Sequence, residues 1–530
     1  MLEAAASLLA NEGWQPQLLE RTATAAACSV KTARVFFQRD EDIVLAMYSR
    51  FAVGLEDKVL ELPDGSLSDR FLAAMSAKLE LAAPYRDALA SLLATMLDPR
   101  HELGVLHPQT EFIRDRVQGV FNAVAAGAAA RPSGLGVEQL GRLLYGLHLM
   151  LALTWCQDRS EGQQATTAAM KMAGDMLSAA TSMMFPLSPA RRFAQRLDGI
   201  AGLLTCEPDD RNVTEAAEAI LRKLYRHRRL FPSAGRCAAN PCERCFTLHL
   251  PRVKYFVRTG LPLHFVLPAF PAKSPSRRKT LGTLPDQAEG QALEFLQATC
   301  NELQGLHPAG VRLTICSDGH VFSDLVGVTD ADVTAYGMGI DRIIARSGLH
   351  SLDTFSMSDL YDGLNLNGIR EHLDQQYSES LEAVEHRVTT FEHDRALFNG
   401  IHRFLFEEFA DIDVSQSRTQ IRKQCKPRAV QVIRRSDAWG RLLADCFPTA
   451  LRLSIHPQHP HSPKIGILLG ETTDVWLTPW HGAAVKTADG WRLMKRHDAE
   501  ELGATVVNLD DRPAYLDLTG VDSPGREGQS

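Results

Sequence analysis

The sequence predicts a multidomain protein with an all-α N-terminal domain and an α/β C-terminal domain. Its 530 residues exceed the ~100–200 residues that one domain usually contains. Residues 1–190 are rich in Ala, Leu and Met at helical spacing and lack β-branched runs, which is typical of packed helices. Further along, short runs of strand-forming residues alternate with helical stretches, which indicates an α/β domain.

Composition and charge exclude several classes of protein. The chain is 45% hydrophobic and 23% charged, as in globular proteins, and its formal net charge of -7 argues against a protein that is basic overall. The longest apolar run, at 143–155, is shorter than the ~20 residues that a membrane span requires, and we see no signal peptide. Ten cysteines over this length do not form a disulfide framework, so we expect a cytoplasmic protein that does not bind membranes.

Three helices are expected in residues 1–47. The first ends at Gly13, the second covers about 18–26, and the third begins after Ser29. Two short helices joined by a tight turn form a helix-turn-helix, whose second helix can enter the major groove of DNA. The sequence therefore predicts a helix-turn-helix head.

This head resembles that of TetR-type repressors, in which an aromatic-Phe pair and an acidic-apolar stretch follow the recognition helix. Phe36-Phe37 and residues 40–43 occupy these positions, and residues 48–190 resemble the ligand-binding and dimerisation helices of that family, which implies a homodimer. Ala27 stands where the family usually has a turn glycine. The basic arm that usually precedes the first helix in that family is missing, which weakens the case for DNA binding because phosphate contacts position such proteins on DNA. DNA binding and a module that only dimerises or senses a ligand therefore both stay open. The residues expected to contact DNA are Lys31, Thr32 and Arg34.

The C-terminal domain is expected over residues 206–515, after a Pro-containing linker at 185–193 and before a polar, disordered tail at 516–530. Strands are expected at 263–270, 311–317, 451–457, 464–470 and 474–480, and a helix at 289–306. Polar clusters follow several of these strands, where open α/β sheets usually bind their ligands.

The first cluster, at 270–289, contains Lys273, Ser274 and Lys279, whose charges and hydroxyl group suit a phosphate or carboxylate ligand. A solvated basic loop is the simpler alternative. Asp286 is expected to begin the helix that follows this loop.

The second cluster, at 316–330, contains Asp318 and Asp324, which could act as acid/base groups or bind an ammonium group. Aspartates that only cap turns are the alternative. On a later helical stretch, Arg418 and Arg435 could bind an anion or form exposed salt bridges.

Three histidines lie between two strand-like runs near the C-terminus. His456 directly follows the first run, whereas His459 and His461 are expected to face solvent in the turn. Arg452 and Lys464 bracket the turn with positive charge that suits a phosphate or carboxylate. We therefore interpret this stretch as part of a substrate site rather than as a metal site.

Four motifs taken together resemble the isocyanide (isonitrile) synthase family of pyoverdine and dityrosine biosynthesis. They are FPAKSPSRRKTLGTLPDQAE at 270–289, SDGHVFSDLVGVTD at 317–330, RLSIHPQ at 452–458 and TPWHG at 478–482. Ser276 departs from the family, which commonly has Asn there. The resemblance covers about residues 210–505 and implies an enzyme that joins an L-amino acid, usually tyrosine or tryptophan, to ribulose 5-phosphate and converts the α-amino group to an isonitrile, with no cofactor required.

This chemistry needs a phosphate clamp, a carboxylate clamp and acid/base groups near an imine. Imidazoles suit the acid/base role because they titrate near the working pH. The residues expected to carry the catalysis are Lys273, Asp324, Arg452, His456 and His481. Those expected to bind the substrates are Ser274, Lys279, Asp318, Arg418, Arg435, Lys464 and Trp480, the last as the floor of an aromatic pocket.

Two alternatives to this reaction stay open. One is the formyl-amide-forming branch of the same family, and the other is a TetR-type transcription regulator whose C-terminal domain senses a ligand. The resemblance also implies a downstream oxygenase as a pathway partner, and it leaves the amino acid undecided between tyrosine and tryptophan.

A cysteine cluster is the remaining candidate site. Cys237, Cys242 and Cys245 are followed by His249, and three thiols with an imidazole could form a structural zinc site. The same cysteine spacing opens the motif of plant-type iron–sulfur proteins. Free cysteines without a metal are the third possibility.

Overall fold

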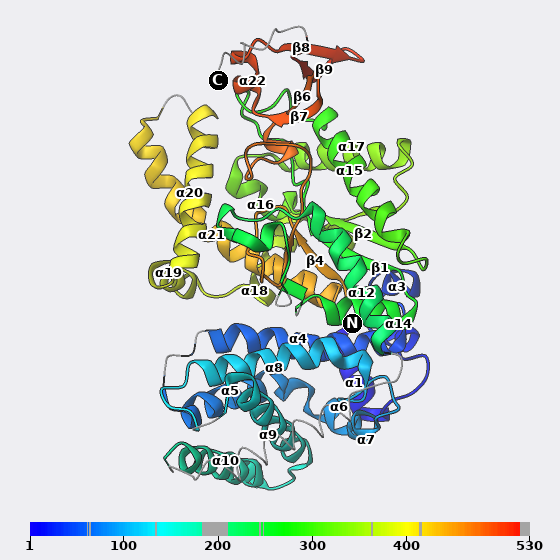
Figure 1. Cartoon of the computed structure of the whole chain (residues 1–530), viewed down its shortest axis with the longest axis vertical. Coiled ribbons are helices and arrows are strands. Elements are labelled where there is room, and N and C mark those ends of the chain that lie inside the picture. Colours follow the sequence, from blue (N-terminus) through cyan, green and yellow to red (C-terminus); the bar gives the residue numbers. More distant parts are fainter. Residues whose placement is uncertain are drawn as a thin grey trace. The chain divides into compact units, whose positions relative to one another are not determined.

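The computed structural model describes residues 1–60, 62, 65–132, 135–182, 210–242, 245–246, 248–361, 364–412 and 416–519 (Figure 1). The chain divides into two compact units. The first comprises Met1–Ala217, Thr247–Thr259 and Asp445–Thr449, and the second comprises Glu218–Phe246, Gly260–Ala444 and Ala450–Ser530. The linker expected at 185–193 lies outside the described residues, as does most of the tail expected at 516–530.

The first unit is built from helices, as the sequence predicts. Its α-helices are α1 (Leu2–Glu12), α2 (Leu18–Ala25), α3 (Val30–Phe36), α4 (Asp40–Leu60), α5 (Leu67–Ala82), α6 (Arg86–Ser91), α7 (Leu93–Leu97), α8 (Glu111–Ala126), α9 (Val137–Gln157), α10 (Gln164–Ser182) and α14 (Leu250–Thr259). Short 3-10 turns occur at Ala83–Tyr85, Pro108–Thr110 and Glu161–Gln163. α12 (Asp210–Leu224) continues along the chain from the first unit into the second.

The expected helix-turn-helix is present at α2 and α3. Ser29 caps α3 because its hydroxyl oxygen accepts the backbone N–H of Thr32 at 3.0 Å. In the turn, Ala27 has a φ of 52°, a left-handed conformation that glycine adopts without strain and alanine does not. The turn geometry is therefore the one for which a glycine is expected at this position.

Helix α14 packs within the helical unit, whereas the sequence assigned it to the C-terminal domain. The Tyr255 hydroxyl donates a hydrogen bond to Oδ1 of Asp42 in α4 at 2.8 Å. Arg258 forms an ion pair with Glu111 of α8 at 3.0 Å. Contacts with residues far apart in the chain thus place α14 in the first unit rather than in the second.

The core of the second unit is a parallel sheet with strand order β3-β2-β1-β4-β5. The strands are β1 (Leu263–Pro268), β2 (Val311–Cys316), β3 (Leu352–Phe355), β4 (Leu451–Ser454) and β5 (Ile465–Gly466). Leu263 of β1 lies opposite Val311 of β2, and Val266 lies opposite Arg452 of β4. Four of the five expected strands are confirmed, and β3 was not expected.

The second unit contains further helices (Figure 1). They are α15 (Gln287–Gln304), α16 (Gly319–Val326), α17 (Asp330–Arg346), α18 (Leu366–Tyr377), α19 (Leu381–Thr390), α20 (Glu392–Ile412), α21 (Arg418–Cys446) and α22 (Arg496–Glu501). Of these, α22 lies beside the second sheet, described below, rather than beside this one. Short 3-10 segments lie at Tyr225–His227, Pro232–Ala238, Met357–Asp359 and Pro479–His481. The helix expected after Asp286 is confirmed: Asp286 caps α15 by accepting the N–H of Ala288 at 2.9 Å.

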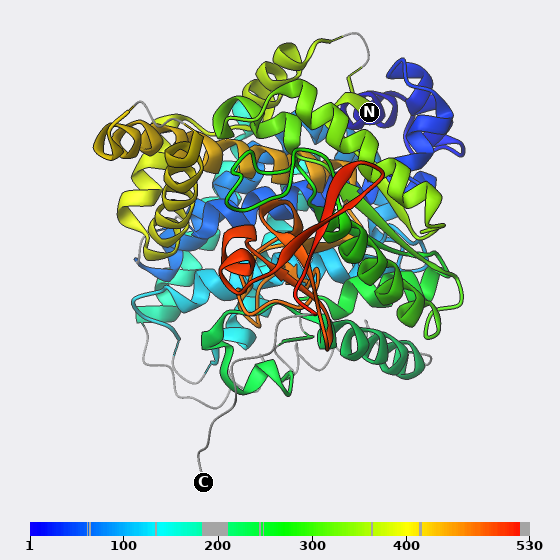
Figure 2. The same cartoon turned by 90° about the horizontal axis from the view of Figure 1, so that it is seen from above.

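A second sheet, with strand order β7-β6-β9-β8, was not expected from the sequence. Its strands, drawn in red shades in Figures 1 and 2, are β6 (Ala483–Thr487), β7 (Gly490–Met494), β8 (Thr505–Leu509) and β9 (Arg512–Asp517). The strand expected at 474–480 is wrong, because Asp474 caps a turn at the N–H of Trp476 and Pro479 begins a 3-10 helix. The start of the expected tail, at 516, lies inside β9.

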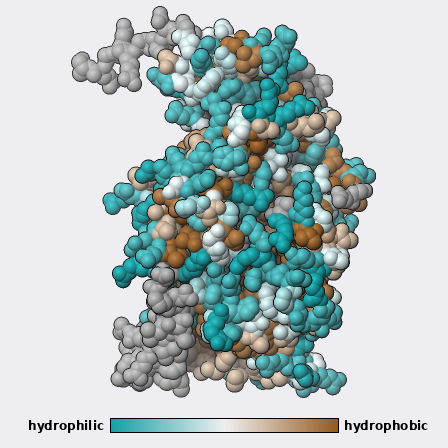
Figure 3. All heavy atoms as spheres, turned by 90° about the vertical axis from the view of Figure 1, so that its right-hand side faces the viewer, coloured by the Kyte–Doolittle hydropathy of each residue, from teal (hydrophilic) through white to brown (hydrophobic). Residues whose placement is uncertain are grey.

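Polar side chains cover most of the molecular face seen in Figure 3. In the part of the chain that the structure describes, none of the helices combines the length and apolar character needed to cross a membrane.

Candidate active site

The strand order of the parallel sheet reverses between β1 and β4. The chain passes from β1 to β2 and β3 on one side, and only later returns to β4 on the other side of β1. Ligands of open α/β sheets bind outside the carboxyl ends of the strands at such a reversal. The loops that follow β1, β2 and β4 carry Lys273, Asp318 and His456, so this edge collects three of the predicted site residues.

The charges of Arg452 and Asp318 influence each other at this end of the sheet, and Nη1 of Arg452 donates to the carbonyl oxygen of Gly440 at 3.4 Å. Burial raises the pKa of Asp318 to about 7, and the charge of Arg452 acts in the opposite direction. Burial also lowers the pKa of Arg452. Among the described residues, neither Nε of Arg452 nor Oδ1 of Asp318 has a hydrogen-bond partner. An unpaired buried polar atom costs about 1–3 kcal/mol, so both atoms are candidates for substrate contacts.

His456 and His481 supply two imidazoles to the same region. Burial lowers the pKa of His456 to about 4 and that of His481 to about 3, and the charges of Lys279 and His456 contribute to the shift at His481. His456 is exposed to solvent, although protein groups around its ring lower its pKa. Nδ1 of His481 lies 3.0 Å from Oγ1 of Thr478. Both rings are therefore neutral at neutral pH, and pKa values this far below 7 make them weak proton acceptors, contrary to the expectation that they titrate near the working pH.

Lys273 lies in a fully buried ion cluster. Its Nζ lies 2.7 Å from Glu289 and 2.8 Å from Asp286, and it donates to the carbonyl oxygen of Pro479 at 3.3 Å. The Tyr336 hydroxyl donates to Glu289 at 3.0 Å. Burial raises the pKa of Glu289 to about 7, while the positive charge of Lys273 opposes that shift. Because an ammonium group has three hydrogens, a substrate phosphate would have to displace one of these partners.

Ser274 and Lys279 both contact Glu408 of α20, which the sequence analysis did not single out. The Ser274 hydroxyl donates to Glu408 at 2.6 Å, and Nζ of Lys279 lies 2.5 Å from the other carboxylate oxygen. Lys279 also lies 5.4 Å from the ring centroid of Phe404, which is itself 4.9 Å from the ring of His481. Glu408 could have been noticed in the sequence, because it belongs to an acidic pair within an otherwise apolar stretch, FLFEEF at 404–409.

Asp324 and Arg435 pair with each other. Nη1 of Arg435 lies 2.5 Å from Oδ1 of Asp324 and donates to the carbonyl oxygen of Val321 at 2.9 Å. Arg370 lies 3.9 Å from the same carboxylate and also pairs with Asp330. Asp324 therefore has cationic partners before any substrate ammonium arrives.

The three remaining predicted substrate residues differ in environment. Trp480 is buried at 1% exposure, and its ring centroid lies 5.2 Å from that of Phe270. Lys464 is exposed, and its charge contributes to the lowered pKa of His456. Arg418 is exposed on α21 with its guanidinium 5.5 Å from the ring centroid of Phe406.

Comparisons with known proteins agree with the expected family. The family model described as pyoverdine/dityrosine biosynthesis protein matches residues 253–507. L-tryptophan isonitrile synthase AmbI2 of Fischerella ambigua is 45% identical over 311 residues, which are 58% of this chain and 94% of that protein. The L-tyrosine isonitrile synthase of Pseudomonas aeruginosa is 40% identical over 305 residues, which are 56% of this chain and 93% of that protein.

The chain belongs to the pyoverdine/dityrosine biosynthesis family. The crystal structure of the PvcA protein from Pseudomonas aeruginosa matches with a TM-score of 0.54 at 40% identity, over 57% of this chain and 99% of that one. The C-terminal region is thus an enzyme of the isonitrile synthase type. The family match begins at residue 253, so it does not assign the N-terminal helices, and none of these comparisons supports the TetR-type resemblance.

The cysteine cluster of this family member could hold a metal ion. The ligand atoms of Cys237, Cys242, Cys245 and His461 all lie within 4.8 Å of one another. The sequence placed the three cysteines together correctly, but it expected His249 as the fourth ligand, whereas His249 is buried and belongs to the helical unit. His461 was expected to face solvent, yet its Nε2 lies 3.4 Å from Sγ of Cys242.

The residues expected to contact DNA lie on or beside α3. Lys31 is exposed, and the Thr32 hydroxyl lies 2.7 Å from that of Ser29. Arg34 is paired with Glu20 at 2.6 Å. Residues 1–47 contain four basic and six acidic residues, so this head lacks the excess of positive charge that drives binding to phosphates.

Proposed function

We propose that this isonitrile synthase converts the α-amino group of an L-amino acid to an isonitrile with ribulose 5-phosphate as the carbon donor, in a lyase-type reaction. Tryptophan is our first candidate for the amino acid and tyrosine our second. The tryptophan enzymes AmbI2 and AmbI1 are 45% and 42% identical to this chain, whereas the tyrosine enzymes are 40% and 38% identical. The observation that carries the proposal is that Arg452 on β4 and Asp318 after β2 each have a buried polar atom without a hydrogen-bond partner among the described residues, at the end of the sheet where the loop after β4 also carries His456.

Each of these groups has a role in the proposed reaction. The amine of the amino acid attacks the ketone of the sugar, and water leaves to form an imine. Phosphate is then lost and the carbon–carbon bonds of the imine carbon break, which releases the rest of the sugar and leaves that carbon on the nitrogen as the isonitrile carbon. The guanidinium of Arg452 binds the phosphate or the carboxylate, because bidentate contacts to planar anions suit it. Asp318, whose pKa lies near 7, exchanges protons with the amine and the imine, and His456 and His481, whose rings are neutral, act as hydrogen-bonding partners of the intermediate.

The paired residues have supporting roles in this proposal. Lys273, Ser274 and Lys279 shape the loop after β1 through their carboxylate partners, and Trp480 lines an aromatic side-chain pocket. Asp324 with Arg435, and the exposed Lys464 and Arg418, contact the substrates only when their present partners move.

The test is incubation of the full chain with ribulose 5-phosphate and either tryptophan or tyrosine, followed by mass spectrometry. We expect consumption of ribulose 5-phosphate and a product with the mass of the isonitrile. A product heavier by one water would indicate the formyl-amide branch instead. If no aromatic amino acid causes ribulose 5-phosphate to be consumed, the reaction is refuted and a ligand-sensing regulator becomes the better explanation.

The helix-turn-helix geometry at α2 and α3 favours a second, separate proposal for the N-terminal unit. We propose a TetR-like module whose role is dimerisation or ligand sensing rather than DNA binding, because Arg34 is already paired and the head has more acidic than basic residues. Light scattering should show a homodimer, and gel-shift assays with upstream DNA should show no sequence-specific complex. A salt-sensitive complex with one DNA sequence would overturn this role.

A further inference from the structure

Four metal-binding side chains from distant parts of the sequence converge at one point of the second unit. Sγ of Cys242 lies 3.7 Å from Sγ of Cys237, 3.7 Å from Sγ of Cys245 and 3.4 Å from Nε2 of His461. All four ligand atoms lie within 4.8 Å of one another. The three sulfurs are not joined as a disulfide, because that bond would bring two of them to ~2.05 Å.

Three of the six separations between ligand atoms agree with tetrahedral coordination of one zinc ion, and the other three are at most 4.8 Å. With Zn–S at ~2.3 Å and Zn–N at ~2.0–2.1 Å, a regular tetrahedron places two sulfurs ~3.8 Å apart and a sulfur and a nitrogen ~3.5 Å apart. The observed 3.7, 3.7 and 3.4 Å differ from these values by about 0.1 Å. Iron–sulfur clusters place several irons and sulfides between their ligands, so a group within 4.8 Å is too tight for them.

The ligand set also points to a structural rather than a catalytic metal. Three thiolates and one imidazole complete a closed four-coordinate shell, whereas catalytic zinc keeps one position open for water or substrate. Soft thiolate ligands in this geometry favour Zn²⁺ over the hard cations Mg²⁺ and Ca²⁺.

The cysteine segment is held in place from its backbone. The Tyr225 hydroxyl donates to the carbonyl oxygen of Cys245 at 2.8 Å, and Arg228 donates to that of Cys237 at 2.7 Å. These contacts hold both ends of the segment at its backbone oxygens, and Arg228 also reaches the thiol of Cys245.

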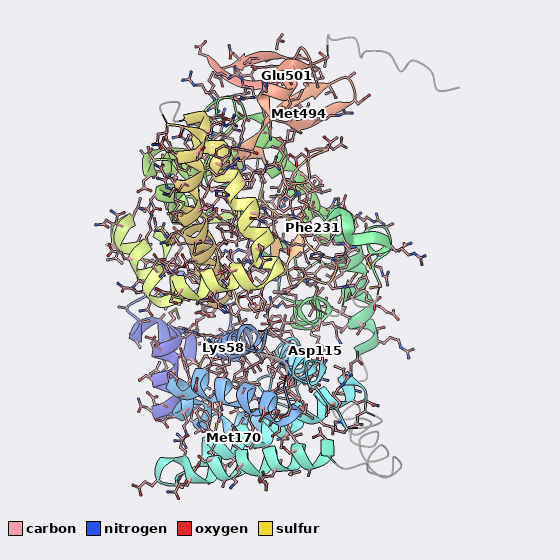
Figure 4. The ribbon with its side chains drawn as sticks, turned by 90° about the vertical axis from the view of Figure 1, so that its left-hand side faces the viewer. Lys58, Asp115, Met170, Phe231, Met494 and Glu501 are labelled. Atoms are coloured by element: carbon pink, nitrogen blue, oxygen red, sulfur yellow. The ribbon has the colours of Figure 1, made fainter. Side chains whose placement is uncertain are left out.

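His461 reaches the cysteines from the turn between β4 and β5, the turn that also carries His456. The chain at Phe231 already contacts this turn: its N–H donates to the carbonyl oxygen of Gln458 at 3.2 Å, and its ring, labelled in Figure 4, lies 4.8 Å from that of His459. A metal bound at His461 would add a second connection between this turn and the chain that follows Phe231. The turn would then be fixed on both sides of His459.

We propose a structural zinc site formed by Cys237, Cys242, Cys245 and His461. The metal fixes the β4–β5 turn to the cysteine segment and thereby positions His456, which lies five residues before the last ligand. The site does not depend on the proposed reaction, since zinc binding is measured without any substrate.

Metal analysis of the full chain, purified without chelators after expression with added zinc, tests the proposal directly. We expect about one zinc ion per chain. Less than about a tenth of an equivalent in the wild-type protein, or an iron–sulfur absorption spectrum, would overturn it.

Matched variants identify the fourth ligand. H461N and C242S should each lose most of the zinc, while H459N, a neighbour in the same turn, and H249N, the ligand expected from the sequence, should retain it. Equal zinc in H461N and the wild type, or equal loss in H459N and H461N, would refute the assignment. Cobalt(II) substitution tests the site in the wild-type protein, so the result does not depend on whether a variant folds. The protein should show the intense absorption of a tetrahedral thiolate site, and a spectrum of octahedral cobalt would also refute the assignment.

Discussion

Replacing Asp318 with asparagine should stabilise the protein at alkaline pH and impair its catalysis. Burial raises the pKa of this carboxyl group from 3.8 to about 7, even though Arg452 opposes the shift. At ~1.4 kcal/mol for each pH unit, this difference corresponds to at most about 4 kcal/mol. Partial solvent access reduces the expected effect to about 1–3 kcal/mol. Asparagine has nearly the same shape as aspartate and removes the buried charge.

The sign of the effect follows from proton binding. Because the pKa of Asp318 is higher in the folded protein, the folded state holds the proton more tightly than the unfolded chain does. The stability that this group contributes is fully present below its unfolded pKa of about 3.9 and is lost as the pH rises to about 7. The variant lacks this titration, so its advantage in free energy of unfolding should grow from about zero near pH 4 to about 1–3 kcal/mol near pH 8.

Urea denaturation of both proteins at several pH values measures this difference. Asp489→Asn is the control, because the Asp489 side chain is 86% exposed and should show no such trend. In the same variant, kcat/KM should fall about 100-fold or more if Asp318 exchanges a proton with the substrate. A stability difference that does not change with pH, or a variant less stable than wild type near pH 8, would refute the reasoning.

Four further predictions concern other parts of the chain. Lys273→Met leaves two carboxylates buried without their cation, so the free energy of unfolding from urea denaturation should fall by about 3–5 kcal/mol; unchanged stability would exclude a structural ion cluster. Arg452→Gln should raise the KM for ribulose 5-phosphate about tenfold or more in steady-state assays, and an unchanged KM would remove Arg452 from the phosphate site. Ala27→Gly should raise the free energy of unfolding by about 0.5 kcal/mol because glycine relieves the strain at a φ of 52°; a loss of stability would show that the turn is not strained. Chelation of zinc should lower the melting temperature, and it should reduce kcat because His456 is no longer held in position. H461N should reproduce both effects and H459N neither. A melting temperature that chelation leaves unchanged contradicts the structural role.

Local patterns were sufficient where neighbours in sequence decide the structure. Ser29 and Asp286 are recognisable as helix starts, since a cap bonds to an N–H only two or three residues ahead. β1, β2 and β4 are mostly buried and rich in apolar, strand-forming residues, as expected for strands covered on both faces of a parallel sheet. The same reasoning failed for the second sheet, where β8 is mostly exposed and the turn at Asp510-Asp511 lacks the glycine of a strong hairpin signal.

The candidate site was predictable in its residue types but not in its pairings. The motifs located Arg452, Asp318 and the two histidines, which the structure brings to one edge of the sheet. They did not show that Lys273 is enclosed by two carboxylates, because Asp286 and Glu289 read equally well as helix-capping residues.

By itself, the sequence determined the family, the helical and α/β composition, and the motifs that carry the chemistry. Only the tertiary structure decided which charges are already paired and which ligand completes the cysteine cluster. The physical reason is that ion pairing and metal coordination depend on distances of a few ångström between residues far apart in the chain, such as Lys279 and Glu408, which are 129 positions apart, and Cys242 and His461, which are 219 positions apart. Local sequence patterns contain no information about such distances.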